Sequence, residues 1–556
     1  MAYNGRVFRG VWEGAMSMIL RVAAVTGAWL LVACGGGSGP GSSAADPFPE
    51  DGPAADVQGD PGGSPDDAAD PGVPFDAPDV APAAGTRLFQ NMIYAGSPWF
   101  IFQDQFEPYV DAMAAAGIDG LHVIGLWRMR CSGCQAGLLD VDTEPAPGVY
   151  DFSPYFARLD YAIGVRHMPV ILSFMWAGRL ESDPVDQGPV PTLPPFLGID
   201  DVAMFRDASG RDLPYENDGR TKVPRFLKGA VRTVMLDYVS AVVRQFRARY
   251  GDAILYYSFA FNTTGENEFS VPAPGLYLDS SPEAAAGFQA FVKGRYPSPE
   301  AVSTAWGRTP AFATFDEVRI LDGNPPPTSG QAPQAYLDFM AYREAALGGF
   351  LHDIRDRVHA EGGRVMAQFG SVWDGLATGR GTLGFGPMVE GFDLVVVDDA
   401  PFYDHGFSMD YVRTNADGVP FGNEADTPAF LGCRSGDLAK CQADFPANID
   451  ADYGNVRLND QMAQTYNRGG TFFDIANWDP YYQVAFKLFG PALDSTVLAV
   501  AQPVTLVPTP TAVQTLSLRD LYVHHEDAAY WTAVLATHAS LGGKTAPIRV
   551  TLDRDL

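Results

Sequence analysis

The sequence predicts an α/β protein, a (β/α)8 TIM barrel with enlarged loops and a small carboxyl-terminal segment. After residue 86 the 556-residue chain alternates short apolar runs with longer amphipathic runs, which is typical of parallel βα units. The short runs number eight, which is the number of strands in such a barrel. No glycine-rich phosphate loop follows an early strand, so a doubly wound sheet is the weaker alternative.

The strands are expected where short runs of apolar residues recur, as in sheets that are buried on both faces. The expected strands are Met92–Ala95, Leu121–Trp127, Pro169–Phe174, Ile254–Phe261, Val365–Phe369, Leu394–Val397, Val419–Phe421 and Thr471–Ile475. Helices are expected where apolar residues recur at the spacing of one helix face. They are Phe106–Ala116, Tyr155–Val165, Phe226–Tyr250, Pro282–Tyr296, Ala332–Ala360 and Ala528–Leu541.

Residues 1–33 resemble a bacterial lipoprotein signal peptide. Arginines precede an apolar run, Val22–Ala33, that is too short to span a membrane as a permanent helix. The run leads into Cys34 through Leu-Val-Ala, which resembles a lipobox, where the chain is cut before a cysteine that becomes acylated. We therefore expect an exported lipoprotein that is anchored to the outer membrane or cell surface through Cys34.

Residues 34–85 are expected to form a disordered acidic linker, followed by the barrel at 86–500 and a small segment at 501–556. The linker consists mainly of Gly, Pro, Ala, Ser and Asp and has too few large apolar side chains to form a core. The whole chain has 67 acidic and 38 basic residues, a formal net charge of −29. Such a field repels phosphates, so the sequence argues against binding of nucleic acid.

Four cysteines remain once Cys34 is assigned to the lipid anchor. They are Cys131, Cys134, Cys433 and Cys441. An exported protein favours disulfides, most simply 131–134 and 433–441. A zinc site with four thiolates is the alternative, because Cys-x-x-Cys is a common ligand spacing. The wider spacing of the second pair favours the disulfides.

The active site of a TIM barrel lies at the carboxyl ends of its strands, and two of these ends carry glutamates. Glu266 and Glu268 follow the fourth predicted strand, and Glu424 follows the seventh, with Asp426 two residues later. Hydrolysis of a glycosidic bond needs two opposed carboxyl groups. One protonates the leaving oxygen, and the other attacks the sugar or activates water.

Several segments resemble glycoside hydrolase family 42, the β-galactosidase family. The matching pieces are Ala115, Gly117-Ile118, Glu144-Pro145, Gly148, Tyr150-Asp151-Phe152, Leu159-Asp160, Pro169–Leu172, Phe291-Val292-Lys293, Arg295-Tyr296, Ala305-Trp306-Gly307, Phe315–Val318, Tyr336–Phe339, Arg468-Gly469-Gly470, Phe472-Phe473 and Trp478. This resemblance spans most of the barrel. It implies a retaining mechanism with two glutamates, on strands four and seven, and no metal or organic cofactor.

The resemblance leaves the acid/base glutamate open. The clan places this residue after an asparagine, which favours Asn267-Glu268, whereas Gly265-Glu266 resembles the acid of β-amylases, a related barrel. Glu266 is slightly preferred because the glycine turn could direct it inward. Glu424 is the expected nucleophile, and Asp426 is the fallback.

The chain also departs from the family in two respects. His122 stands where the family has an arginine that orients the nucleophile. A core histidine whose ring is bonded to a carbonyl is an equally good interpretation of His122. We expect no counterpart of the carboxyl-terminal domains of the β-galactosidases, because only about 80 residues follow Trp478, so the identity of the substrate does not carry over.

Sugar rings present apolar faces that pack on aromatic side chains, so aromatic and polar residues near strand ends are the expected substrate contacts. These residues are Trp127, Trp176, Asn262, Trp373, Asp374, Tyr403, Asn477 and Trp478. The pair Asp398-Asp399 could ligate a cation, although solvated acids are the simpler interpretation.

The sequence therefore predicts a surface-anchored retaining hydrolase of β-linked galactose-containing or related oligo- or polysaccharides. One alternative is a non-catalytic carbohydrate-binding lipoprotein on a hydrolase-like barrel. Another is an inverting hydrolase similar to β-amylase. The separation of the two carboxyl groups distinguishes retention, at about 5 Å, from inversion, at roughly 6.5 to 9.5 Å.

Overall fold

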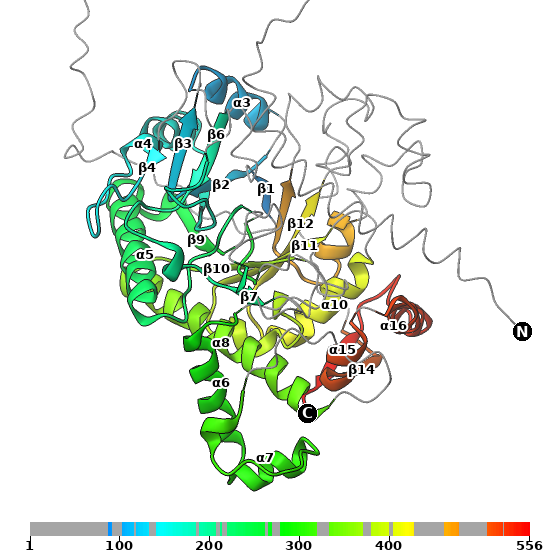
Figure 1. Ribbon diagram of the computed structural model, residues 1–556. Helices are drawn as coiled ribbons and strands as arrows, with labels where there is room; N and C mark the ends of the chain where they lie inside the picture. The colour runs from blue at the N-terminus through cyan, green and yellow to red at the C-terminus, as the bar shows by residue number, and fades with distance from the viewer. Residues whose placement is uncertain are drawn as a thin grey trace, which may run out of the picture.

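A computed structural model describes the chain in fifteen stretches (Figure 1). They are residues 87–91, 103–115, 118–132, 141–184, 188–206, 212–213, 220–261, 265–269, 279–319, 333–370, 380–399, 404–426, 461–476, 509–525 and 527–556. The predicted signal peptide and linker lie outside these stretches. Within them, no helix is both long and apolar enough to cross a membrane.

The core of the fold is one sheet of eight strands, in which all the paired neighbours run parallel. The strands are β1 (Arg87–Asn91), β2 (Gly120–Leu126), β5 (Val170–Met175), β9 (Ile254–Ala260), β10 (Met366–Phe369), β11 (Leu394–Asp399), β12 (Phe421–Asp426) and β13 (Phe472–Ala476). Their order in the sheet is β10-β11-β12-β13-β1-β2-β5-β9.

This strand order is the one that a (β/α)8 barrel has when it is cut open at one seam. Each strand lies beside the next strand of this sheet along the chain, and the last, β13, pairs with the first, β1. The seam lies between β9 and β10, which meet at a single bridge from Tyr257 to Val365. The parallel α/β sheet is established. A single bridge does not form a continuous pairing between β9 and β10, so full closure of the barrel stays a prediction.

Six of the eight predicted strands are confirmed with small shifts at their ends, and the seventh, expected at Val419–Phe421, shares only Phe421 with β12. The first is placed differently, because the structure has a strand at Arg87–Asn91 and residues 92–95 lie outside the described stretches. The sequence of β1, Arg-Leu-Phe-Gln-Asn, contains only two apolar residues, so it does not look like a buried strand. β12 begins at Phe421 and continues to Asp426, which places Glu424 within the strand.

The six predicted helices are confirmed, and three more, α7, α10 and α15, are present in the described residues. The helices are α3 (Gln103–Ala115), α4 (Ser153–Leu159), α5 (Gly229–Tyr250), α6 (Pro282–Arg295), α7 (Pro299–Ala305), α8 (Gln334–Ala360), α10 (His405–Asn415), α15 (Leu518–His524) and α16 (Ala528–Ser540). A π-helical turn, Asp160–Val165, extends α4. Local sequence sets the start of α6, where Pro282 is the first helical residue and the Ser281 hydroxyl accepts the Ala284 N–H.

Apolar side chains form two clusters that distinguish the two faces of the sheet. The larger cluster joins the strands to the helices, and α5 and α8 lie together in it (Figure 1). The fully buried members of the smaller cluster all come from strands: Ile171, Leu255, Met366, Leu394, Val396 and Phe472. The smaller cluster therefore lies on the sheet face that points away from the helices.

The carboxyl-terminal residues form a small unit beside α10 (Figure 1). Its strands, β14 (Val513–Ser517) and β15 (Arg549–Asp553), pair in parallel, with α15 and α16 between them in sequence. Arg413 and Asn415 of α10 donate hydrogen bonds to the carbonyl oxygens of Ile548 and Val550. Short strands also form outside the main sheet: β3 (Arg128–Ser132), β4 (Val141–Asp142), β6 (Gly188–Thr192), β7 (Phe205–Arg206) and β8 (Asp212–Leu213).

Candidate active site

A layer of polar side chains lies next to the smaller apolar cluster, toward the carboxyl ends of the strands. Alternate residues of a strand face the same side, so the residues two positions after the apolar ones share their face. Ser173, Gln368, Asp398 and Asp474 follow Ile171, Met366, Val396 and Phe472 in this way. Register pairing adds His122, Ser258 and Glu424 to the same face. We call these seven residues the polar layer.

His122 is at the centre of a buried chain of hydrogen bonds across three strands. Its Nδ1 lies 2.6 Å from Oδ2 of Asp474, and its Nε2 lies 2.7 Å from Oγ of Ser173. All three side chains have no exposed surface. The core interpretation of His122 was therefore right about its burial, but the ring is bonded to a carboxyl group and a hydroxyl group.

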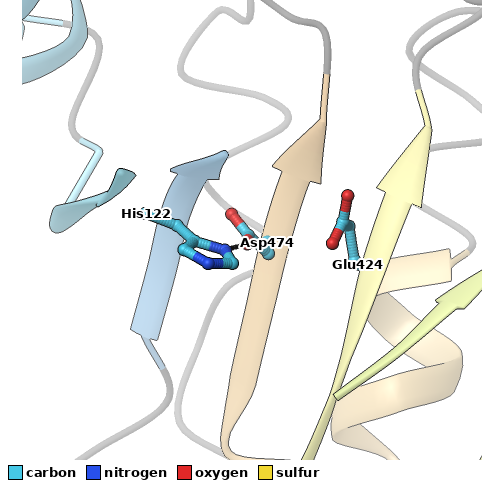
Figure 2. A group of neighbouring side chains, drawn as sticks. All are labelled: His122, Glu424 and Asp474. Carbon is cyan, nitrogen blue, oxygen red and sulfur yellow. Dashed lines mark hydrogen bonds and ion pairs between the residues drawn. The ribbon is translucent and has the colours of Figure 1, made fainter. Parts of the chain in front are cut away.

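Asp474 and Glu424 are direct neighbours, because they are paired in register between β13 and β12. Figure 2 shows the His122 ring bonded to Asp474, with the Glu424 side chain on the neighbouring strand. One ligand atom from each of the three side chains lies within 4.8 Å of the others. Burial raises the pKa of the Asp474 carboxyl above its usual value, and the His122 ring opposes this rise.

Glu424 is held by residues of the neighbouring strands. It is 1% exposed, and its Oε2 accepts a hydrogen bond from the Gln368 side-chain amide of β10. The residue before it, Asn423, donates from Nδ2 to the Val397 carbonyl oxygen at 2.9 Å. The position of Glu424 is thus fixed by side chains from β10 and by the β11–β12 pairing.

The turn after β9 contains the other two glutamates, and both are buried. Gly265 has a φ of 108°, a conformation that favours glycine, and Glu266 follows it at 5% exposure. Glu268 is 2% exposed, accepts the Gly370 N–H at 3.0 Å and pairs with Arg380 at 3.0 Å. Both glutamates are therefore buried in this turn, and Glu268 joins it to the residues that follow β10.

Asn267, between them, connects this turn to β10. Its backbone N–H donates to the Gln368 carbonyl oxygen at 2.7 Å, and its side-chain oxygen accepts the Gln368 N–H at 2.8 Å. Since the Gln368 side chain binds Glu424, a continuous set of contacts joins the turn with Glu266 and Glu268 to the strand with Glu424. The structure thus brings the three predicted carboxyl groups to one end of the sheet.

Two of the predicted sugar contacts lie in the hydrophobic core. Trp127 is 1% exposed and donates from its indole N–H to Glu144, and Trp176 is fully buried with its ring stacked on Phe259 and Phe261. Because neither indole has an open face, their placement does not support sugar stacking. The other predicted contacts lie outside the described residues: Asn262, Trp373, Asp374, Tyr403, Asn477 and Trp478.

Most of the cysteines also lie outside the described stretches. Cys131 is in β3, and its backbone pairs with Pro189 of β6. Cys34, Cys134, Cys433 and Cys441 are not described, so the disulfide and zinc alternatives both stay predictions.

The sequence interpretation missed Ser173, Gln368 and Asp474. The signal that could have found them is a polar residue two positions after an apolar one within a buried strand, as in Phe472-Phe473-Asp474. It also gave no role to Glu144. This carboxyl accepts the Trp127 indole N–H at 2.9 Å and the Gly148 N–H at 3.0 Å, and burial raises its pKa to about 7.

By residue type, His122, Asp474 and Glu424 could also hold a metal ion. A nitrogen and an oxygen bound to one tetrahedral zinc ion, each at about 2.0 to 2.1 Å, would lie about 3.3 to 3.4 Å apart. The observed 2.6 Å between Nδ1 and Oδ2 is instead the length of a short hydrogen bond. Nε2 is engaged by Ser173, so both ring nitrogens are used in hydrogen bonds.

Comparisons with known proteins give a fold but no family. No protein-family model matches the chain, and no curated protein matches it. A β-galactosidase from the Antarctic haloarchaeon Halorubrum lacusprofundi aligns with a TM-score of 0.52 at 15% identity, over 85% of this chain and 67% of that one. A β-galactosidase from the psychrophilic Marinomonas ef1 aligns with a TM-score of 0.53 at 13% identity, over 84% and 70%.

A third similar structure is a catalytic mutant of Gan42B, a GH42 β-galactosidase from G. stearothermophilus. Its TM-score is 0.55 at 11% identity, over 85% of this chain and 66% of that one. The chain thus spans about two thirds of the length of these enzymes. At such low identity the likeness concerns the fold, and it agrees with the fold implied by the sequence resemblance.

Proposed function

We propose that the protein is a retaining glycoside hydrolase that cleaves β-linked, galactose-containing or related saccharides on a closed (β/α)8 barrel. The observation that carries this proposal is the placement of Glu424. It is a buried carboxyl group in the polar layer and is connected through Gln368 to the turn with Glu266 and Glu268. The likeness to three β-galactosidases in fold agrees with this assignment.

Glu424 is the nucleophile in this proposal. A carboxylate that attacks an anomeric carbon must be rigidly placed and ionised. The Gln368 amide donates a hydrogen bond to Oε2 of Glu424, which orients the group and favours its ionised form. Asp426, the fallback, ends the same strand two residues later.

Glu266 is the acid/base in this proposal, because the contacts of Glu268 favour the ionised form of that residue. The Arg380 guanidinium and the Gly370 N–H both stabilise an ionised Glu268. A general acid must instead carry a proton when the substrate binds. Glu268 then acts structurally, by joining the turn after β9 to the residues that follow β10.

The reaction proceeds in two steps with balanced proton transfers. A carboxylate oxygen of Glu424 bonds to the anomeric carbon while Glu266 protonates the departing oxygen, which breaks the glycosidic bond. Glu266 then removes a proton from water, whose oxygen attacks the anomeric carbon and releases Glu424. The product keeps the β configuration, and no metal or organic cofactor takes part.

We also propose that the enzyme works at the cell surface, where a lipid on Cys34 holds it and the acidic linker extends it from the membrane. The lipobox-like run and the linker composition support this location. Incorporation of radiolabelled fatty acid into the protein, and its loss in Cys34→Ser, is the expected outcome. A soluble, unlabelled wild-type protein would contradict the anchor.

The activity is tested with a panel of aryl β-glycosides and galactose-containing polysaccharides. Wild type is compared with Glu424→Gln, Glu266→Gln and Glu268→Gln. Glu361→Gln is the matched control, because Glu361 pairs with Arg244 at the end of α8. We expect Glu424→Gln and Glu266→Gln to lose at least about 10³-fold in kcat, a typical loss when a catalytic group is removed.

The anomeric configuration of the first product, followed by NMR, tests the stereochemistry. A β product supports retention, and an α product contradicts it in favour of the inverting alternative. Wild type that binds saccharides but hydrolyses none of the panel would favour the non-catalytic carbohydrate-binding lipoprotein. Equal activity in Glu424→Gln and Glu361→Gln would rule out the assigned nucleophile.

A further inference from the structure

We propose that His122 and Asp474 are positioning residues that control the ionisation of Glu424, with a protonated His122 supplying the positive charge that the two adjacent carboxylates require. This inference rests on the proposed function, in which Glu424 is the nucleophile. In this inference the role of His122 is electrostatic, because its positive charge acts on the ionisation of Glu424.

The polar layer contains more acidic side chains than basic ones. Asp398, Glu424 and Asp474 are paired in register across β11, β12 and β13, so three acids lie side by side on one face. Like charges at this separation in a buried site repel one another strongly. Within the polar layer, as far as the structure describes it, His122 is the one side chain that can carry a positive charge.

Other described elements at this end of the sheet also carry charged or polar side chains. The turn after β9 contributes Glu266 and Glu268, and Arg380 is paired with Glu268 at 3.0 Å. From β10 comes the neutral Gln368, which donates its amide to Glu424. Arg380 pairs with Glu268, so among the described residues we assign the positive charge beside Glu424 to His122, which has a ring nitrogen within 4.8 Å of that carboxyl group.

Both nitrogens of the His122 ring make hydrogen bonds. The bond from Nδ1 to Asp474 can form in either protonation state, because Nδ1–H donates in both. The hydroxyl of Ser173 can accept from Nε2–H or donate to a bare Nε2. The ring can therefore gain or lose a proton without losing a hydrogen bond, which leaves its charge to be set by the carboxylates beside it.

The consequence for catalysis follows from the order of bond changes. Before attack, the imidazolium of His122 offsets one of the two negative carboxylates, so Glu424, Asp474 and His122 together carry a net charge of −1. When Glu424 bonds to the sugar, its charge is consumed, and the remaining Asp474–His122 pair is neutral overall. Removing only the imidazolium leaves Glu424 beside an uncompensated carboxylate, which raises the pH at which Glu424 becomes ionised.

The closing experiment is a pH profile of kcat/KM for wild type, His122→Asn and the double variant His122→Asn/Asp474→Asn. The asparagine keeps a donor near the position of Nδ1. We expect the acidic limb of the His122→Asn profile to move upward by about one pH unit or more. The plateau value of kcat/KM should fall by a smaller factor than the one that this shift represents. In the double variant the limb should move back toward the wild-type position, because the repelling carboxylate is gone.

His538→Asn is the matched control, because His538 of the carboxyl-terminal unit is bonded to an aspartate, Asp410 of α10. Its acidic limb should stay at the wild-type position. An unmoved limb in His122→Asn would overturn the proposal, as would a double variant whose limb lies higher than that of the single variant. A purely structural role of His122 predicts lower activity in both variants at an unchanged limb.

A second readout needs no activity, so a failure of the proposed function can be told apart from a failure of this inference. Ring ¹⁵N shifts of His122, assigned by the signal lost in His122→Asn, should report an imidazolium at pH 6 in wild type. In Asp474→Asn the same ring should lose its proton at a lower pH. A neutral His122 ring in wild type at pH 6 contradicts the inference even if the enzyme is active.

Discussion

The part of the chain that the structure describes contains two buried histidine–aspartate pairs with opposite surroundings. His538 of α16 bonds to Asp410 of α10 at 3.0 Å, and His122 of β2 bonds to Asp474 of β13 at 2.6 Å. All four side chains have no exposed surface. The residue types and the burial are therefore the same, and only the neighbours distinguish them.

Asp410 is saturated by donors. It accepts hydrogen bonds from His538 and the Ile548 N–H, and it pairs with Arg413 at 3.2 Å and Arg468 at 3.3 Å. Each of these contacts joins α10 to another segment or to its own last turn. Negative charge is matched here by positive charge, so the pair acts as a structural connection.

Asp474 has the opposite balance. Its Oδ1 makes no hydrogen bond of normal geometry with the described residues, and its nearest acidic neighbour, Glu424, adds a second negative charge. A buried group that is not balanced costs stability and is maintained where it has a function. The comparison teaches that the neighbours of a buried pair, rather than the pair itself, indicate whether it is structural or functional.

The largest expected effect separates the two aspartates by stability. Asp410→Asn leaves Arg413 and Arg468 without their counter-charge, and we expect a loss of about 3–5 kcal/mol in the free energy of unfolding. Asp474→Asn removes one of two repelling carboxylates, so its free energy of unfolding should stay within about 1 kcal/mol of wild type or increase. Urea unfolding at pH 7 measures both. Equal losses in the free energy of unfolding for the two variants would contradict the difference drawn between Asp410 and Asp474.

The next effect concerns Glu144, a buried acid whose pKa burial raises to about 7. The folded state binds the Glu144 proton more tightly than the unfolded state, so this group makes stability fall as pH rises from about 4.5 to about 7. The loss amounts to about 3 kcal/mol at most. Glu144→Gln shifts stability by a constant and should remove this part of the slope. A variant with the wild-type slope would contradict the expectation.

A smaller effect is expected where the carboxyl-terminal unit meets α8. The Tyr522 hydroxyl donates to the buried Glu344 at 2.5 Å, and Gly384 donates its N–H to the other carboxylate oxygen at 2.8 Å. Tyr522→Phe leaves one buried oxygen without this donor, at a cost of about 1–3 kcal/mol in thermal or urea unfolding. The control is Tyr161→Phe, which removes a bond to the partly exposed Asp111 and should cost less.

The smallest effect is expected at an exposed charge pair. Arg244 of α5 pairs with Glu361 at 2.6 Å, but its side chain is 66% exposed. Arg244→Ala should change the free energy of unfolding by no more than about 0.2–1 kcal/mol, and less in high salt. A loss as large as that of Asp410→Asn would mean that burial does not determine how much an ion pair contributes to the stability of this protein.

The repeating pattern of the strands was predictable because each strand carries its own apolar signature. β2, β5, β10 and β11 are nearly continuous apolar runs, and their order in the sheet follows their order in the chain. β1 was displaced because only two of its five residues are apolar. The glutamates were predictable because they follow or end recognisable strands.

The contacts within the polar layer were not predictable in the same way. His122 and Asp474 are 352 positions apart, and the pair exists because β13 and β2 both lie next to β1. Such a contact depends on the register of two strand pairings, which the sequence of either strand does not contain. Trp176 was misjudged for a related reason, because its ring faces are covered by Phe259 and Phe261 of the next strand and its end.

The most direct test of the central claim is to trap the sugar on the nucleophile. Wild type is incubated with 2-deoxy-2-fluoro-β-glycosyl fluorides of several sugars, which form a slowly hydrolysed ester with the nucleophile of a retaining enzyme, and the labelled peptide is mapped by mass spectrometry. The account predicts one label, on Glu424, and none on Glu424→Gln. A label on Glu266, Glu268 or Asp426 instead would contradict the assignment of the nucleophile and the role given to His122 and Asp474.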